Sequence, residues 1–224
     1  MKILFCAYRD WAKRVLPTIE KHPNVTSVRH VTSNEELYAI MQSLVGKNYE
    51  AVLFCGWSSP PNKWSVDAIP MFTEHPATSD LFSEGTPLQN QVLNGIRYSK
   101  HRLVKVGYPE LSLRQFSHEV DIDLSGNMDD ITNQMESTSK MLFNQFLDVY
   151  PNVDWKEWPV EPETSWYKKR VPDDSKVTKE MLAKLSTEEL YDLFRVLESP
   201  YPNAYLEDDK GRLYFNKVSF KRKR

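Results

Sequence analysis

The sequence has few residues of the kinds that mark specialised protein classes. Among its 224 residues there are only two cysteines, Cys6 and Cys55, and seven glycines. Two cysteines that each lie in a short apolar run indicate buried thiols of a reducing compartment rather than a disulfide framework. Because no G-x-G-x-x-G or phosphate-loop pattern follows an apolar run, a dinucleotide-binding site has little support. No set of residues has metal-ligand spacing, so we predict no metal site.

The chain also lacks a strong net charge and a long apolar run. Its formal net charge is −2, so nothing global favours nucleic acid or an anionic membrane as a partner. The basic end, Lys221–Arg224, is a local exception, either a solvated tail or a binding patch. The first segment turns polar after Tyr8, which is not typical of a signal peptide, and no run is long enough to span a membrane. We therefore expect a cytoplasmic protein.

The first half alternates apolar runs with segments of helical period. The runs typical of buried strands are Lys2–Tyr8, Ser27–Thr32 and Tyr49–Trp57. Helical patterns lie between them, over Asp10–His22 with Pro17 at a kink or break, and over Ser33–Asn48 with a capping box at its start. This order predicts an α/β fold with a doubly wound, mostly parallel sheet.

Two loops lie where a ligand is expected. In such sheets ligands bind beyond the carboxyl ends of the strands. The first loop is Gly56–Trp64, after the third strand, and the second follows a short strand around Ile69–Thr73. The second loop carries His75 and leads to a helix that starts at Thr86–Pro87.

The second half changes in composition. It predicts strands over His101–Tyr108 and His118–Gly126, a helix over Met128–Leu147, a capped helix over Ser186–Ser199 and a hairpin that turns at Asp208–Gly211. The stretch between the two helices is rich in Pro, Trp and charge, and we expect it to be extended. We predict a catalytic domain over 1–150, a wrapping linker over 151–185 and a C-terminal helix-and-hairpin module over 186–224.

Several short motifs occur together in a recognisable order. "GWS" at 56–58 precedes a proline, "HP" stands at 75–76, "GTPLQNQVLNG" at 85–95, and "SPYPNAY" at 199–205. In this order, and over Lys2–Val218, the chain resembles the folate-dependent formyltransferases, above all the methionyl-tRNA and sugar-nucleotide N-formyltransferases. The resemblance implies a formyltransferase-like variant of the Rossmann fold.

The resemblance implies a transferase with 10-formyltetrahydrofolate as co-substrate. A neutral amine attacks the formyl carbon, the carbonyl oxygen becomes an oxyanion, and an imidazole can stabilise that charge and relay a proton. A carboxylate near the amine completes the set. The acceptor that the resemblance favours is a nucleotide-linked amino sugar, because the chain is short for a tRNA-reading domain.

The catalytic positions match the family in part. His75 falls on the family's histidine, and two residues before it Thr73 stands where asparagine is usual. Ser112 falls on the aspartate, and Arg114 on the glycine that follows. We assign Glu110, two residues before Ser112, as the substitute carboxylate. Taken alone, a histidine at this position is more often a surface-loop or core histidine.

Other residues are candidates of lower specificity. Glu74, Asp80 and His118 are further substitutes for the aspartate, although each also fits a solvated surface group. Gly56, Trp57, Ser58 and Ser112 are assigned to the folate, with Trp57 as a wall of the pterin pocket or a packing residue. Gln89, Asn90 and Tyr201 are assigned to the substrate, Tyr201 by stacking on a nucleobase.

Three functions fit these residues. The first is formyl transfer to a small-molecule amine. The second is a different transfer on the same scaffold, with the 109–118 segment serving another donor or acceptor. The third is an inactive relative that acts as a binding or assembly subunit. The apolar C-terminal helix and hairpin are compatible with a homodimer.

Overall fold

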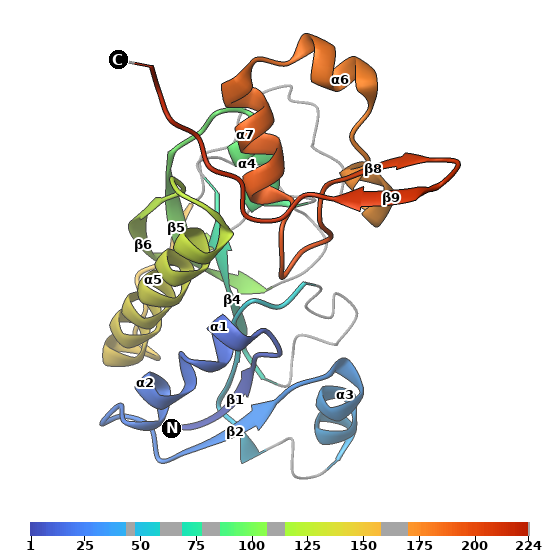
Figure 1. Ribbon diagram of the computed structural model, residues 1–224. Coiled ribbons are helices and arrows are strands. Elements are labelled where there is room, and N and C mark those ends of the chain that lie inside the picture. The colour runs from blue at the N-terminus through green and yellow to red at the C-terminus, as the bar shows by residue number, and fades with distance from the viewer. Residues whose placement is uncertain (44–47, 59–68, 78–85, 107–114, 158–169, 224) are drawn as a thin grey trace. The chain divides into compact units, whose positions relative to one another are not determined.

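The computed structural model describes residues 1–43, 48–58, 69–77, 86–106, 115–157 and 170–223 (Figure 1). The strands are β1 (Lys2–Cys6), β2 (Ser27–Val31), β3 (Ala51–Phe54), β4 (Met71–Pro76), β5 (Tyr98–Val106), β6 (Gln115–Asp123), β7 (Lys156–Glu157), β8 (Tyr205–Asp208) and β9 (Gly211–Tyr214). The helices are α1 (Asp10–Lys13), α2 (Leu16–Glu20), α3 (Asn34–Gln42), α4 (Pro87–Leu93), α5 (Met128–Val149), α6 (Lys179–Lys184) and α7 (Thr187–Val196), with a 3-10 turn at Pro172–Ser175.

The main sheet is mixed. Its strand order is β2-β1-β3-β4-β5-β6-β7. β1 pairs in parallel with β2 and β3, and β3 pairs in parallel with β4, whereas the β4–β5 and β6–β7 pairs are antiparallel. The continuous apolar runs of the first half therefore form the parallel part, as strands covered on both faces do. The predicted α/β class is confirmed.

The chain forms two compact units. Unit 1 comprises Met1–Pro76, Lys100–Ile122 and Met135–Val160, and unit 2 comprises Ala77–Ser99, Asp123–Gln134 and Glu161–Arg224. The division of the sequence at residues 150 and 185 stays a prediction.

In unit 1 alternate strand residues build two separate cores. On one face Leu4, Cys6, Val52, Phe54 and Met71 pack with Leu37 and Ile40 of α3. On the other face Phe5 meets Phe143 of α5 edge-on at 6.1 Å between ring centroids, and Phe72 lies 4.6 Å from Phe146. Successive side chains of a strand point to opposite faces, so each strand serves both cores.

Several element boundaries differ from those that the sequence predicts. Pro17 does break the first helical segment, because α1 ends at Lys13 and α2 carries Pro17 in its first turn. The strand expected to end at Thr73 continues to Pro76, since it pairs with β5 as far as His101. His75 therefore lies on a strand and not in a loop. β5 and β6 each begin three residues earlier than predicted.

Unit 2 confirms the predicted C-terminal module. α7 begins after Ser186, whose hydroxyl accepts from the Glu189 N–H while the Glu189 carboxylate accepts from the Ser186 N–H. α7 contacts α4, which starts at Pro87 as predicted (Figure 1). β8 and β9 form the hairpin, and the Asp208 carboxylate accepts from the Lys210 N–H at 2.8 Å in its turn.

Over the ranges described, no helix has both the length and the apolar character needed to cross a membrane. In the same ranges no group of three or more His, Cys, Asp and Glu side chains is placed to hold a metal ion.

Both cysteines are expected to resist alkylation in the folded protein. Cys6 and Cys55 are fully buried and form no disulfide, as predicted. Burial raises the pKa of both thiols, and for Cys55 the neighbouring Glu74 carboxylate adds to this effect. Mass spectrometry after native iodoacetamide treatment at about pH 8 should find no adduct, because the reactive thiolate is scarce. The unfolded chain should carry two adducts, and a native adduct would contradict this burial.

Candidate functional site

The carboxyl ends of β1, β3 and β4 meet at one edge of unit 1. Tyr8 and Arg9 follow β1, and Gly56–Ser58 follow β3. Phe54 of β3 pairs with Thr73 of β4, so Gly56, two residues on, lies level with His75. This edge is where ligands bind in sheets of this kind.

A cavity of about 230 Å³ lies at this edge. It is lined by Tyr8, Thr32, Ser33, Asn34, Trp57 and Ser58. The Trp57 Nε1–H donates to Asn34 Oδ1 at 3.1 Å, and the Tyr8 ring meets the Trp57 ring edge-on with centroids 5.3 Å apart. The Tyr8 hydroxyl also hydrogen-bonds Ser58 Oγ. Two aromatic rings beside hydroxyl and amide groups suit a planar heterocyclic ligand. We call this cavity the Trp57 pocket.

Arg9 places a cation at the Trp57 pocket. Its Nε–H donates to the Gly56 carbonyl at 3.0 Å, and its Nη2 donates to Ser58 Oγ at 3.1 Å. The guanidinium carbon lies 5.2 Å from the centroid of the Tyr8 ring. Arg9 was not predicted, because its only signal in the sequence is its place after a buried strand. A guanidinium here favours a ligand with an anionic group.

His75 shares a sheet face with the core that Trp57 packs against. Side chains alternate along β4, so Thr73 and His75 lie on the face of Met71, whose core cluster Trp57 contacts. Both are half-buried, and the Thr73 hydroxyl donates to the Glu74 carbonyl at 3.3 Å. The structure therefore brings Thr73 and His75 to one face at the expected edge.

A buried cation lies beside His75. In the β4–β5 ladder His75 is paired with Arg102, which is 5% exposed. The Arg102 Nε–H donates to Glu119 Oε2 at 2.8 Å. Residues paired across a ladder share a face, so a guanidinium and an imidazole stand side by side. The sequence analysis missed Arg102, and only its place in an alternating strand could have indicated it.

Glu74, one of the possible substitutes for the family's aspartate, is buried, so its interpretation as a solvated surface group is wrong. Its side chain is 8% exposed and lies on the opposite face of β4 from His75, where it contacts His101. It therefore does not supply a carboxylate beside His75. His118 is on β6, where burial and the Lys156 charge lower its pKa, which favours the neutral imidazole.

The remaining predicted site residues fall elsewhere. Asp80, Glu110, Ser112 and Arg114 lie outside the described residues. Gln89 and Asn90, which the sequence analysis assigns to the substrate, are buried on α4 in unit 2. Tyr201 is half-buried in the same unit, and its N–H donates to the Glu198 carbonyl.

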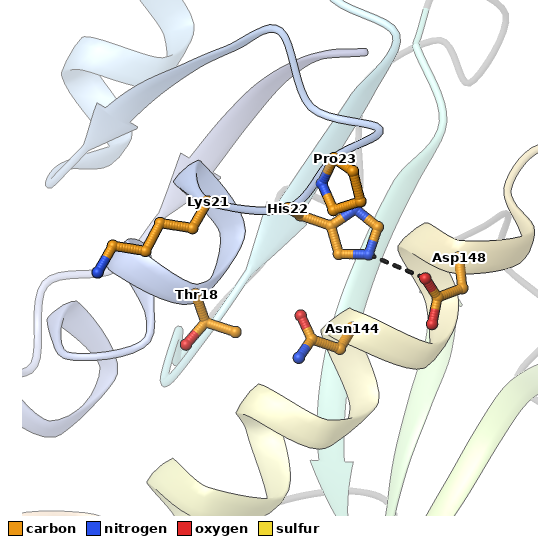
Figure 2. Close-up of a pocket in the computed structure, with 6 residues that line it drawn as sticks. All are labelled: Thr18, Lys21, His22, Pro23, Asn144 and Asp148. Carbon is orange, nitrogen blue, oxygen red and sulfur yellow. Dashed lines mark hydrogen bonds and ion pairs between the residues drawn. The ribbon is translucent and has the colours of Figure 1, made fainter.

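A larger cavity, about 360 Å³, lies between α2 and α5 and not at the carboxyl edge (Figure 2). Its histidine is fully engaged. His22 Nδ1 accepts from the Asn24 N–H at 3.3 Å, so Nε2 carries the proton and donates to Asp148 at 3.2 Å. Because both ring nitrogens are occupied by the protein, His22 is not a proton relay for a substrate.

Solved structures share this fold over nearly the whole chain. A methionyl-tRNA formyltransferase from Clostridium thermocellum is 24% identical with a TM-score of 0.79, and the match covers 99% of this chain and 94% of that one. A 4-N formyltransferase from Francisella tularensis is 14% identical with a TM-score of 0.70, and the match covers 98% of both chains. HypX from Aquifex aeolicus, solved in complex with tetrahydrofolic acid, is 14% identical with a TM-score of 0.69, over 92% of this chain and 36% of that one.

No family model and no curated protein matches the sequence. The structural matches nevertheless show that the chain has the fold of the formyltransferases, as the motif order predicts. The chain spans almost the full length of two of the enzymes above.

Proposed function

We propose that the protein is an N-formyltransferase that moves a formyl group from 10-formyltetrahydrofolate to an amine on a nucleotide-linked amino sugar. The observation that carries this proposal is a histidine at the carboxyl edge of a formyltransferase fold, level with the loop that forms the Trp57 pocket. Full-length similarity to a solved sugar N-formyltransferase from Shewanella supports a sugar acceptor.

His75 and Arg102 supply the electrostatics that this reaction needs. As the amine attacks, the formyl oxygen gains negative charge, and an imidazole N–H aimed at it stabilises the transition state. The same imidazole can pass a proton to the leaving folate nitrogen. Arg102, on the same face and paired with Glu119, would offer guanidinium N–H groups on the side where the oxyanion develops. Thr73 would contribute one hydroxyl in place of an amide.

The Trp57 pocket would hold a ring system and Arg9 an acidic group attached to it. A pterin with its glutamate tail and a nucleobase with its diphosphate both have this chemistry. We assign the pocket to the pterin, with Gly56, Trp57 and Ser58 as donor-binding residues. Ser112 would also serve at the folate, Glu110 beside the reacting amine, and Gln89, Asn90 and Tyr201 at the acceptor.

Donor binding tests this proposal directly. Calorimetric titration with 5-formyltetrahydrofolate, a stable donor analogue, should give saturable binding that weakens at least about tenfold in Trp57→Ala, because an aromatic wall is lost. Trp155→Phe is the matched control, because Trp155 stacks on Phe72 within unit 1, and its binding should equal that of the wild type. Binding of UDP but not of the folate would reassign the pocket to the acceptor.

A second function is favoured by Thr73, which stands where the resemblance implies asparagine. On this alternative the protein is a formyltransferase-fold protein with a different donor or acceptor, or a binding subunit. Absence of binding at millimolar folate would leave this alternative.

A further inference from the structure

Glu74 makes two hydrogen bonds within the buried part of unit 1. Its Oε1 accepts from the Gly56 backbone N–H at 2.5 Å. Its Oε2 lies 3.1 Å from His101 Nε2, and His101 is fully buried. His101 Nδ1 lies in turn 2.7 Å from the Thr138 hydroxyl of α5. Burial of polar groups is costly unless they are hydrogen-bonded, and these bonds connect the loop after β3 with β5 and α5.

The contacts continue from the strands into α5. The Thr138 hydroxyl also lies 3.2 Å from the Met135 carbonyl, within hydrogen-bond distance. The Gly56 N–H donates to the other oxygen of the Glu74 carboxylate. Glu74 therefore joins the loop after β3 to β5 and, through His101, to α5.

Gly56 is held by ionic groups at both its polar atoms. Its N–H donates to Glu74, and its carbonyl accepts from Arg9. Its φ of +59° favours glycine, and a Cβ there would lie 2.9 Å from Trp11 Cζ2. A glycine is the most freely rotating residue of a chain, so its conformation needs outside restraint. Trp57 and Ser58, which line the Trp57 pocket, follow directly.

We propose that Glu74 and His101 are positioning residues for the Trp57 pocket. The pair anchors Gly56 to β4, and this anchor sets the place of the Trp57 ring and the Ser58 hydroxyl for a planar heterocyclic ligand. The effect on ligand binding rests on the proposed function, whereas the anchoring of Gly56 does not. Glu74 is also one residue before His75, so the same anchor fixes the loop relative to the imidazole.

Two variants distinguish the hydrogen bond that anchors Gly56 from the charge of Glu74. In Glu74→Gln the amide oxygen can accept from Gly56 and the amide N–H can donate to a neutral His101, so every hydrogen bond is retained. In the double variant Glu74→Met/His101→Leu both side chains become apolar. Proteins often tolerate such a replacement of a buried ionic pair without unfolding. Only the double variant leaves the Gly56 N–H without an acceptor.

Hydrogen exchange of the Gly56 amide, followed by NMR, reports on the anchor without any ligand. We expect slow exchange in the wild type and in Glu74→Gln, and exchange at least about tenfold faster in the double variant, because the loop opens locally. The Kd for 5-formyltetrahydrofolate should stay within about twofold in Glu74→Gln and rise at least about tenfold in the double variant. Phe143→Leu, a core change on α5, is the control that lowers stability without changing Kd.

Several results would overturn the positioning role. Unchanged Gly56 exchange in the double variant would show that Glu74 does not restrain the loop. If the double variant has the same Kd as Phe143→Leu, Glu74 and His101 contribute to stability and do not position the Trp57 pocket. Equal loss of binding in Glu74→Gln would assign the effect to charge instead of anchoring. If the wild type does not bind the folate, the ligand assignment fails, while Gly56 exchange still decides the anchor.

Discussion

Replacement of His75 by alanine is expected to lower kcat for formyl transfer by about 10²–10³-fold, the typical cost of removing one oxyanion donor. The Kd for the folate donor should change by less than about threefold, because the imidazole is assigned to the transition state and not to the ground state. Single-turnover transfer from 10-formyltetrahydrofolate, with donor binding measured separately, gives both quantities.

The position of His75 explains why the loss should fall on kcat. It lies on β4, a strand whose backbone pairs with β3 on one side and β5 on the other. A side chain on a paired strand is held in place before the reaction, which is what electrostatic stabilisation of a transition state requires. Arg102 beside it keeps guanidinium N–H donors at the edge in the variant, so activity should fall without vanishing.

His22→Asn is the matched control for the loss of a histidine. His22 is a buried imidazole of the same unit, and it bonds Asp148 in the cavity between α2 and α5. Its replacement should lower thermal stability and leave kcat unchanged. If His75→Ala keeps more than about a third of wild-type kcat, another group stabilises the oxyanion, and the catalytic assignment of His75 is wrong.

The periodic parts of the fold could be predicted from the sequence because their pattern is set by burial alone. The apolar runs at Lys2–Tyr8 and Tyr49–Trp57 gave β1 and β3, and the Ser186 capping box gave the start of α7. The extension of β4 to Pro76 was missed, since residues 74 and 75 are polar. Polar residues continue a strand when a neighbouring strand and buried partners satisfy them, and these partners are distant in the sequence.

The polar contacts of the candidate site were predicted less completely, because their partners are also distant in the sequence. Glu74 and His101 are 27 residues apart, and neither has a neighbour in sequence that reveals the pair. Arg102 meets His75 only through the antiparallel register of β4 and β5. The motifs pointed to His75, Trp57 and Ser58 because those positions match a known order. Contacts between residues distant in the sequence had to come from the structure.

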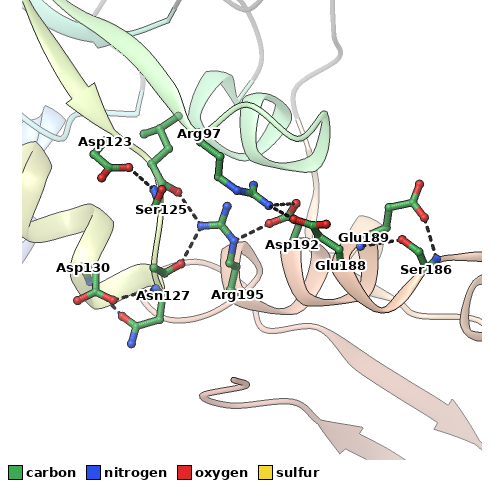
Figure 3. Close-up of polar contacts among 12 residues, drawn as sticks. Arg97, Asp123, Ser125, Asn127, Asp130, Ser186, Glu188, Glu189, Asp192 and Arg195 are labelled. Atoms are coloured by element: carbon green, nitrogen blue, oxygen red, sulfur yellow. Dashed lines mark hydrogen bonds and ion pairs between the residues drawn. The ribbon is translucent and has the colours of Figure 1, made fainter. Parts of the chain in front are cut away.

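Replacement of Arg195 by methionine is expected to lower the free energy of unfolding by about 3–5 kcal/mol, because two carbonyls lose their donor at a cost of about 1–3 kcal/mol each. Arg195 is 1% exposed, and its Nε–H donates to Asp192 Oδ1 at 2.6 Å. Its Nη1 donates to the carbonyls of Leu124 and Gly126, each at 2.7 Å (Figure 3). The change removes this donor from both carbonyls, which belong to the segment that follows β6.

The loss of stability in Arg195→Met is limited because Asp192 also contacts a second cation. Its Oδ2 accepts from Arg97 Nη2 at 2.8 Å, so the carboxylate stays paired in the variant, and the loss should come chiefly from the two carbonyls. Urea denaturation measures the change, with Arg212→Met as the control. Arg212 pairs with Glu207 on the exposed hairpin, and its loss should leave the midpoint unaltered. A change below about 1 kcal/mol in Arg195→Met would mean that water replaces the guanidinium at these carbonyls, and that Arg195 does not hold α7 to the segment after β6.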